Sequence, residues 1–145
     1  MVYRATSKEM HIIAEMAIQL LSSHTVDELE KEFANLLNDG RIAFFVKFVN
    51  NVPVGFAQCS LRNEYVEGTS SSPVGYLEGI FVCEKYRNKG IAKELLTNCE
   101  KWAKTKDCVE FASDCDLDNI ASLKFHEAMK FVEVNRIICF KKNIL

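Results

Sequence analysis

The sequence predicts a single α/β domain, over residues 1–145, in which helices cover a mixed β-sheet. Some segments carry apolar residues at helical spacing, whereas others are short, nearly continuous apolar runs rich in Val, Ile and Phe. The two kinds of segment follow one another in the order β-α-α-β-β-β-α-β-α-β. No repeat, low-complexity stretch or Pro/Gly-rich linker divides the chain, and 145 residues are a usual length for one domain.

The first half of the chain is expected to hold a strand, two helices and a hairpin. The expected elements are a strand over 2–5, helices over 8–21 and 26–38, and strands over 41–49 and 52–61. The second helix has one apolar face, made of Val26, Leu29, Phe33, Leu36 and Leu37. Gly40 is expected to end this helix, as glycine often does just past a helix terminus. Asn50-Asn51 between the last two strands predicts a tight β-hairpin turn.

The second half begins with a polar loop that contains Gly68, a serine cluster and Pro73. The elements expected after it are strands over 74–82, 109–113 and 131–141 and helices over 89–106 and 119–129. The longer helix carries an apolar side, formed by Ile91, Leu95, Leu96, Cys99 and Trp102. This side predicts that the helix packs against the sheet.

Composition and charge argue against several classes of function. Hydrophobic residues make up 48% and charged residues 26%, which is typical of a globular protein in water. The formal net charge is -2, from 18 basic and 20 acidic residues, whereas nucleic-acid-binding proteins normally have a clear basic excess. Residues 1–10 lack the apolar centre of a signal peptide, and apolar runs such as 42–46 are too short to span a bilayer. We therefore expect a cytoplasmic protein that binds neither nucleic acid nor membrane.

Six cysteines are scattered along the chain, at positions 59, 83, 99, 108, 115 and 139. None of them forms a CxxC pair or a Cys/His cluster with the spacing of zinc ligands. We expect reduced thiols, several of them buried as small apolar side chains, and no metal site.

The segment 87–92, Arg-Asn-Lys-Gly-Ile-Ala, follows a strand and opens a helix. Main-chain N–H groups at a helix start have no partner within the helix, and the helix dipole adds positive potential there. Gly90 lets a phosphate approach the main chain, and Arg87, Lys89 and Lys93 add positive charge. The pattern is neither a P-loop nor GxGxxG. It favours a pyrophosphate as ligand, with an ordinary basic helix start as the alternative.

This R-x-x-G-x-A pattern, placed after the strand sequence LEGIFV, resembles the acetyl-CoA motif of the GCN5-related N-acetyltransferase (GNAT) superfamily. The order of elements is also similar over essentially the whole chain, and 119–131 resembles the second cofactor segment of that superfamily. The resemblance implies that the strand offers main-chain groups to the pantetheine arm and that the helix start wraps the pyrophosphate. The implied acetyl-CoA-binding residues are Ile80, Phe81, Val82, Arg87, Asn88, Lys89, Gly90, Ile91, Ala92, Lys93 and Asn119.

The stretches EYVEGTSSSPVGYLEGIFV, EFASDCDLDN and FKKN are, in addition, similar to bacterial aminoglycoside 6'-N-acetyltransferases, which are antibiotic-resistance enzymes. This likeness implies that Tyr65, Glu78 and Asp114 line the site of a small cationic amine. Carboxylates attract a polycation such as an aminoglycoside, which agrees with that role. The chain departs from these enzymes at Leu21, where they often carry Trp, and at Asn135, where they carry an acidic residue.

Acetyl transfer to an amine sets chemical requirements that these residues can meet. A protonated amine must lose a proton before it attacks, whereas the thioester is already activated and needs no covalent enzyme intermediate. Glu78 is the candidate amine anchor and general base, with a purely positioning role as the alternative. Asp114 either binds the acceptor or caps the following helix. His126 shares a helix face with Asn119 and either protonates the departing thiolate or is structural.

Three functions stay open from the sequence. The first is acetylation of the 6'-amine of an aminoglycoside, the second is acetylation of a polyamine, metabolite or peptide N-terminus, and the third is a non-catalytic acyl-CoA sensor. Relatives often form dimers, and the apolar final strand with Ile137, Ile138 and Phe140 is expected to pair with a partner's sheet edge in a homodimer.

Overall fold

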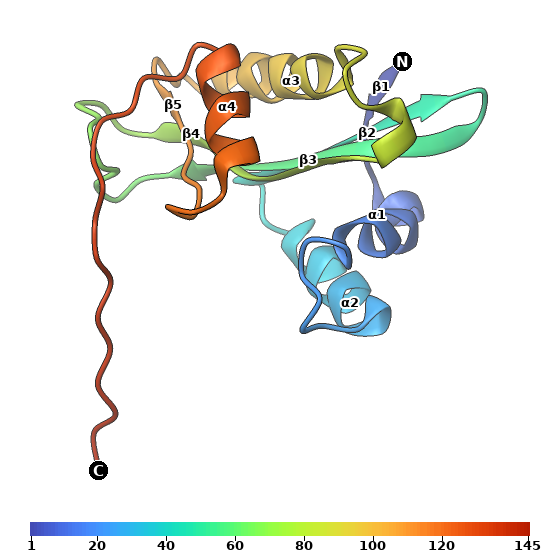
Figure 1. Cartoon of the computed structure of the whole chain (residues 1–145). Coiled ribbons are helices and arrows are strands. Elements are labelled where there is room, and N and C mark those ends of the chain that lie inside the picture. The colour runs from blue at the N-terminus through green and yellow to red at the C-terminus, as the bar shows by residue number, and fades with distance from the viewer.

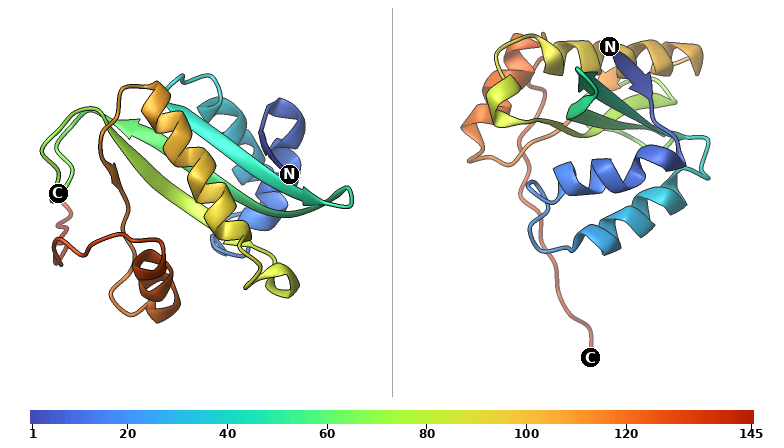
Figure 2. Two further views of the ribbon diagram at one scale, coloured as in Figure 1. Left: turned by 90° about the horizontal axis from the view of Figure 1, so that it is seen from above. Right: turned by 90° about the vertical axis from the view of Figure 1, so that its right-hand side faces the viewer.

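The computed structural model describes all residues, 1–145, and shows a five-stranded sheet between two helical layers (Figure 1). The strands are β1 (Val2–Arg4), β2 (Ile42–Val49), β3 (Val52–Arg62), β4 (Val74–Val82) and β5 (Phe111–Ala112). The helices are α1 (Met10–Ala17), α2 (Val26–Leu36), α3 (Ile91–Thr105) and α4 (Ile120–Ala128), with short 3-10 turns at Ser7–Glu9 and Glu84–Tyr86. Helices α1 and α2 lie on one side of the sheet, and α3 and α4 lie on the other (Figures 1 and 2). None of these helices has the length and apolar character needed to cross a membrane.

The alternation of side chains along the strands divides the core into two parts. In β2, Ala43 and Phe45 face α3, whereas Phe44 and Val46 face α1 and α2. The apolar side predicted for the helix over 89–106 is confirmed, because all of its residues belong to α3 and are buried in the core between α3 and the sheet. Both faces of the sheet are therefore covered, as expected for this fold class.

The predicted hairpin and helices are confirmed with small shifts of their ends. Asn50 and Asn51 have φ angles of 50° and 66°, as a tight turn between β2 and β3 requires. Gly40 differs from the expectation, because α2 ends at Leu36, before it, and Gly40 has no positive φ angle. The chain leaves α2 through two hydrogen-bonded turns, in which Asp39 N–H donates to Leu36 and Ile42 N–H to Asp39.

The final strand predicted over 131–141 is wrong for the single chain. Residues 131–145 form no helix or strand, and they run away from the body of the protein (Figure 1). A strand needs a neighbouring strand to pair its main-chain N–H and C=O groups, and no strand of the same chain pairs with this segment. Its large apolar side chains are consequently exposed: Val132, Val134, Ile137, Ile138, Phe140, Ile144 and Leu145.

Strand β4 is only partly paired, and it contains a β-bulge. β4 is antiparallel to β3 and parallel to β5, but its pairing with β5 covers only Gly75↔Phe111 and Tyr76↔Ala112. Beyond Tyr76 the two strands separate, so one edge of β4 is left without a strand partner. The register with β3 also shifts, because Gln58 pairs with Gly79 and Cys59 with Leu77. Glu78 is therefore the extra residue of a β-bulge, a device that re-aims a side chain.

A histidine joins α1 to α2 on the side of the molecule opposite α3. His11 Nε2 lies 2.7 Å from Glu15 of α1, and Nδ1 lies 2.9 Å from Glu30 of α2. The hydrogen bond to Glu30 is the largest cause that raises the pKa of His11 above 6.5. A raised folded-state pKa gives a stabilisation that is fully present below the unfolded pKa and is lost as the pH rises through the folded pKa.

We expect His11→Gln to lower the melting temperature most near pH 6 and to have no effect at pH 9. Near pH 6 the imidazole is protonated while both carboxylates remain ionised, whereas at pH 9 the wild-type imidazole is neutral and the ionic contribution is absent. Thermal melts of the two proteins between pH 5 and pH 9 measure this, since every other titrating group is common to both. A melting difference that does not vary with pH would show that His11 acts through packing alone.

Candidate active site

The bulge in β4 presents Glu78 to two side chains of β3. Arg62 Nη2 donates to both carboxylate oxygens of Glu78, at 2.6 Å to Oε1 and 3.0 Å to Oε2. Ser60 Oγ donates to Oε2 at 3.1 Å. The Glu78 side chain is 23% exposed, whereas the residue as a whole is exposed, so the uncovered part is largely its main chain. Glu78 is thus a fixed carboxylate beside an open strand edge.

A second carboxylate joins this group through Tyr76. The Tyr76 hydroxyl donates a hydrogen bond to Asp114, which follows β5, and burial together with this bond raises the pKa of Tyr76. The Arg62 guanidinium carbon lies 3.4 Å from the centroid of the Tyr76 ring. Glu78, Arg62, Tyr76 and Asp114 therefore form one connected cluster, in which two carboxylates flank an aromatic ring. Such a combination binds cations through charge and through the π face.

A hollow of about 440 Å³ adjoins the cluster on the side of the polar loop. Its lining residues are Arg41, Leu61, Arg62, Asn63, Glu64 and Tyr65. Tyr65 is 75% exposed, and its hydroxyl accepts a hydrogen bond from the Gly68 N–H at 3.3 Å. Its ring is therefore accessible at the rim of this hollow.

A serine and a histidine meet where β4 and β5 separate. Ser113 directly follows β5, and its Oγ lies 2.7 Å from His126 Nε2 and 3.4 Å from the Leu77 carbonyl oxygen of β4. His126 Nδ1 lies 2.7 Å from the Ser122 carbonyl oxygen, which can only accept. Nδ1 must therefore carry hydrogen, and any proton exchanged by His126 passes through Nε2, toward Ser113.

The open edge of β4 has the geometry of a main-chain binding surface. Ile80, Phe81 and Val82 pair with β3 on one side only, opposite Ala57, Phe56 and Gly55 respectively. Their other side faces the gap left by β5. The Val82 carbonyl oxygen already accepts a hydrogen bond from Arg87 Nε at 2.8 Å. An extended amide-containing molecule can add to this edge in the manner of a further strand.

The start of α3 is shaped for an anion. Asn88 and Gly90 have positive φ angles, of 62° and 80°, and no side chain caps the helix. The first internal bond runs from the Glu94 N–H to the Gly90 carbonyl, so the N–H groups of Ile91, Ala92 and Lys93 donate to no group of the chain. No atom lies within 4 Å of where a Cβ of Gly90 would be. Unpaired N–H groups and an open approach suit a phosphate.

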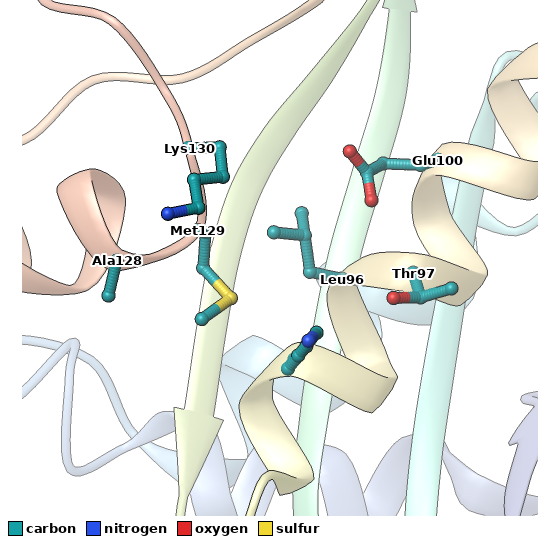
Figure 3. Close-up of a pocket in the computed structure, with 7 residues that line it drawn as sticks. Leu96, Thr97, Glu100, Ala128, Met129 and Lys130 are labelled. Atoms are coloured by element: carbon teal, nitrogen blue, oxygen red, sulfur yellow. The ribbon is translucent and has the colours of Figure 1, made fainter.

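A small pocket of about 110 Å³ lies between α3 and α4, close to this helix start (Figure 3). It is lined by Lys93, Leu96, Thr97, Glu100, Ala128, Met129 and Lys130. Figure 3 shows the Met129 side chain directed toward Leu96 across the gap. Asn119, at the start of α4, uses its Oδ1 to cap that helix by accepting from the Ser122 N–H at 3.1 Å. Only its amide nitrogen is left for another partner.

The predicted residues lie on both faces of the sheet, because Ile80 and Val82 pack on the side of α3, whereas Glu78 contacts Ser60 on the face covered by α1 and α2. Leu21 is 42% exposed in the turn after α1, in the helical layer on the same side of the sheet as Glu78. Asn135 donates to Glu67 at 2.5 Å and thereby ties the start of the projecting segment to the polar loop. No group of three or more His, Cys, Asp or Glu side chains is placed to hold a metal ion.

Sequence reasoning missed Ser60, Arg62, Tyr76 and Ser113. A signal for three of them exists: Ser60 and Arg62 are two residues apart in one strand, and Tyr76 and Glu78 are two apart in the next strand. Residues at this spacing share a face of a sheet. Their register could not be deduced, because the bulge at Glu78 shifts it by one residue. Nothing in the spacing of Ser113 and His126 indicated their contact.

Known proteins resemble this chain over nearly all of its length. Residues 10–131 match the acetyltransferase (GNAT) family. An aminoglycoside N(6')-acetyltransferase type 1 of Salmonella typhimurium is 39% identical over 124 residues, which are 86% of each chain. Aminoglycoside acetyltransferase AAC(6')-Iy, solved with the bisubstrate analogue CoA-S-monomethyl-acetylneamine, has a TM-score of 0.94 at 33% identity and covers 99% of this chain and 98% of its own. AAC(6')-Ih of Acinetobacter baumannii has a TM-score of 0.89 at 35% identity, with 99% and 98% covered.

These likenesses agree with the geometry of the site. The open β4 edge, the uncapped start of α3 and the acidic cluster occur in one chain whose fold matches solved acetyltransferases throughout. The expectation drawn from the sequence is confirmed, and this chain belongs to the GNAT family of acetyltransferases.

Proposed function

We propose that this acetyltransferase transfers the acetyl group of acetyl-CoA to the 6'-amine of aminoglycoside antibiotics and so confers resistance to them. The observation that carries the proposal is the cluster of Glu78, Tyr76 and Asp114 beside the open edge of β4. The relatives named above are aminoglycoside 6'-N-acetyltransferases, and one was solved with an acetylneamine bisubstrate analogue. A polycationic acceptor suits a site with two carboxylates.

Acetyl-CoA is assigned to the open edge and to the start of α3. Ile80, Phe81 and Val82 offer main-chain groups to the pantetheine arm. The pyrophosphate is held by the segment 87–93, with the charges of Arg87, Lys89 and Lys93, the unpaired N–H groups of Ile91 and Ala92, and the turn through Asn88 and Gly90. The Asn119 amide nitrogen, free of the helix cap, adds one donor.

Glu78 acts on the acceptor. The amine arrives as an ammonium ion, which the Glu78 and Asp114 carboxylates bind, with Tyr65 at the rim. One proton passes to Glu78, directly or through water, and the nitrogen lone pair then attacks the thioester carbon. When the tetrahedral intermediate collapses, the C–S bond breaks and the nitrogen gives up a second proton. One proton leaves with the free thiol of CoA and one is released to solvent, so the charges balance.

His126 and Ser113 act on the leaving group. The Nδ1–H of His126 stays hydrogen-bonded to the Ser122 carbonyl oxygen, and the ring exchanges a proton through Nε2. The proton moves from Nε2 to Ser113 Oγ, while the Ser113 hydroxyl proton moves to the thiolate sulfur. The serine forms no covalent bond in this scheme. Its position where β4 and β5 separate supports this assignment.

We expect Ser113→Ala and His126→Gln each to lower kcat by about tenfold or more, with smaller changes in either KM. Because the two residues act as one relay, the double variant should be no slower than the worse single variant. Steady-state kinetics between pH 5 and pH 9 measure both effects, and Ser113→Thr, which keeps the hydroxyl, should retain activity. Additive losses in the double variant would contradict a shared relay.

Release of CoA thiol against a panel of amines tests the function directly. Turnover with kanamycin or tobramycin, and none with analogues that carry a 6'-hydroxyl, would establish the reaction and the position acetylated. Turnover only with polyamines, metabolite amines or peptide N-termini would retain the acetyltransferase and replace the acceptor. Binding of acetyl-CoA without turnover of any amine would favour a sensor. The second of these outcomes draws support from Leu21 and Asn135, where the related aminoglycoside enzymes often carry Trp and an acidic residue.

We also propose a cytoplasmic location and a homodimer. Cys83, Cys115 and Cys139 are free and not fully buried, which suits a reducing compartment. The segment 131–145 projects from the body of the protein (Figure 2). Its large apolar side chains are exposed, and exposed apolar patches are typical of interfaces. The alignment with AAC(6')-Iy includes nearly all of this segment, since it covers 99% of the chain. A second copy that pairs with the segment would satisfy its main-chain groups.

We expect sedimentation to show a dimer, and Ile138→Asp to shift it to monomer. Ile138 is 80% exposed in the single chain, so the substitution costs nothing in an isolated copy but places a charge in an apolar interface. Lys142→Asp, which changes a charged residue of the same segment, serves as the control and should stay dimeric. A wild-type protein that sediments as a monomer at assay concentrations would remove the dimer.

A further inference from the structure

We propose that the guanidinium group of Arg62 occupies the ammonium position of the acceptor site in the free enzyme and competes with every acceptor amine for Glu78. The inference rests on the proposed function, because it takes the cluster around Glu78 as the place where the acceptor amine binds. An acceptor must displace this internal cation before its own ammonium group can contact Glu78.

The contacts of Arg62 are those that an ammonium ion would make. Its Nη2 bridges both oxygens of Glu78, and its guanidinium lies over the face of Tyr76, whose hydroxyl is bonded to Asp114. A carboxylate beside an aromatic face is a standard arrangement for binding a cation. With Ser60 on Oε2, two donors already contact that oxygen and one contacts Oε1. An incoming ammonium therefore competes with Arg62 for Glu78.

Arg62 is placed so that it can leave. It is the last residue of β3, its side chain is 43% exposed, and it lines the hollow of about 440 Å³ beside the cluster. Glu64 lines the same hollow and offers a carboxylate for the displaced guanidinium. A partly exposed ion pair contributes little to folding, so its opening leaves the sheet intact.

The exchange of cations weakens the binding of acceptors. Each acceptor amine replaces one positive charge on Glu78 by another, so the loss of the Arg62 contact offsets part of the attraction between Glu78 and the amine. This cost is the same for a monocation and for a polycation, because both displace the same guanidinium group. Removal of the Arg62 charge should therefore strengthen the binding of both kinds of acceptor, since the acidic residues that bind them are retained.

Kinetics of Arg62→Met and Arg62→Lys with two acceptors test the proposal. The acceptors are tobramycin, a polycation, and 6-amino-6-deoxyglucose, a monocation with the same kind of amine. In Arg62→Met, KM for both acceptors should fall by a similar factor of about fivefold, since the same competing cation is removed for each. Arg62→Lys, which keeps the competing charge, should leave both KM values near those of the wild type. Ethylguanidinium, which refills the vacated position, should inhibit Arg62→Met competitively against the acceptor and inhibit wild type more weakly.

Arg41→Met is the matched control, because Arg41 lines the same hollow but is bonded to Asp39. It should leave KM for both acceptors within about twofold of the wild-type values, because Arg41 does not contact Glu78. A rise in KM for both acceptors with a lower kcat in Arg62→Met would overturn the proposal and make Arg62 a support for Glu78. If the wild type acetylates no amine, the proposed function fails, and calorimetric binding of tobramycin and 6-amino-6-deoxyglucose to the wild type and to Arg62→Met still tests Arg62 by the expected fall in both dissociation constants.

Discussion

Replacement of Glu78 by Gln is expected to lower kcat/KM for the acceptor amine by about 10²- to 10³-fold. The amide keeps the size of the side chain and one acceptor oxygen, but it can neither attract an ammonium ion by charge nor take its proton. Both roles assigned to Glu78 are lost together, whereas acetyl-CoA is assigned to the other end of β4 and the start of α3. The KM for acetyl-CoA should therefore change by less than about threefold.

The kinetics of CoA release, at saturating acetyl-CoA and varied tobramycin, measure this effect. Glu32→Gln makes the same chemical change on the exposed face of α2 and serves as the control. Melting curves check the fold, because Arg62 loses its carboxylate partner in the variant. A Glu78→Gln enzyme with wild-type kcat/KM would exclude this residue as base and as anchor. A variant that changes KM but not kcat would leave it as an anchor only.

Replacement of Gly90 by Val is expected to raise KM for acetyl-CoA by about tenfold or more and to destabilise the fold by about 1–2 kcal/mol. The φ angle of Gly90 is 80°, which a β-branched residue adopts only with strain. Its side chain would also occupy the open approach to the N–H groups at the start of α3, where the pyrophosphate is assigned. The acceptor site is unaffected, so its KM should change little.

Gly40→Ala provides the control for this substitution. Gly40 has no atom within 4 Å of a built Cβ and no positive φ angle, so the added methyl group meets neither contact nor strain. Calorimetric titration with CoA and thermal melting separate the two effects of Gly90→Val. Normal CoA affinity in a folded Gly90→Val protein would show that the phosphate lies elsewhere. A normal melting temperature would show that the turn relaxes.

Much of this architecture can be predicted from local patterns. The strand over 74–82 is confirmed with both ends correct, and the buried side of α3 is confirmed residue by residue. Asn50-Asn51 predicts its turn because few residues tolerate two successive positive φ angles. These features depend on residues close together in the chain, whose local conformational preferences are kept in the folded protein. The same holds for the start of α3, where Gly90 and the neighbouring cations are contiguous.

The contacts within the candidate site depend instead on distant parts of the chain. Arg62 meets Glu78 and Tyr76 only because a β-bulge shifts the register between β3 and β4 by one residue. Ser113 meets His126 only because β5 ends after two residues and α4 folds back beside it. A shift of one residue moves every following side chain to the other face of a strand, so pairing cannot be deduced from spacing alone.

The sequence by itself determined the fold class and the acetyl-CoA motif, because both follow from patterns along the chain. The resemblance of its short stretches to known acetyltransferases implied the candidate roles of Glu78, Asp114 and His126. Only the tertiary structure decided that Arg62 forms an ion pair with Glu78 and that Ser113 is hydrogen-bonded to His126. It also decided that residues 131–145 do not join the sheet of their own chain. The physical reason is common to all three: each depends on which strand edge lies beside which, and strand pairing is settled by the packing of the whole chain.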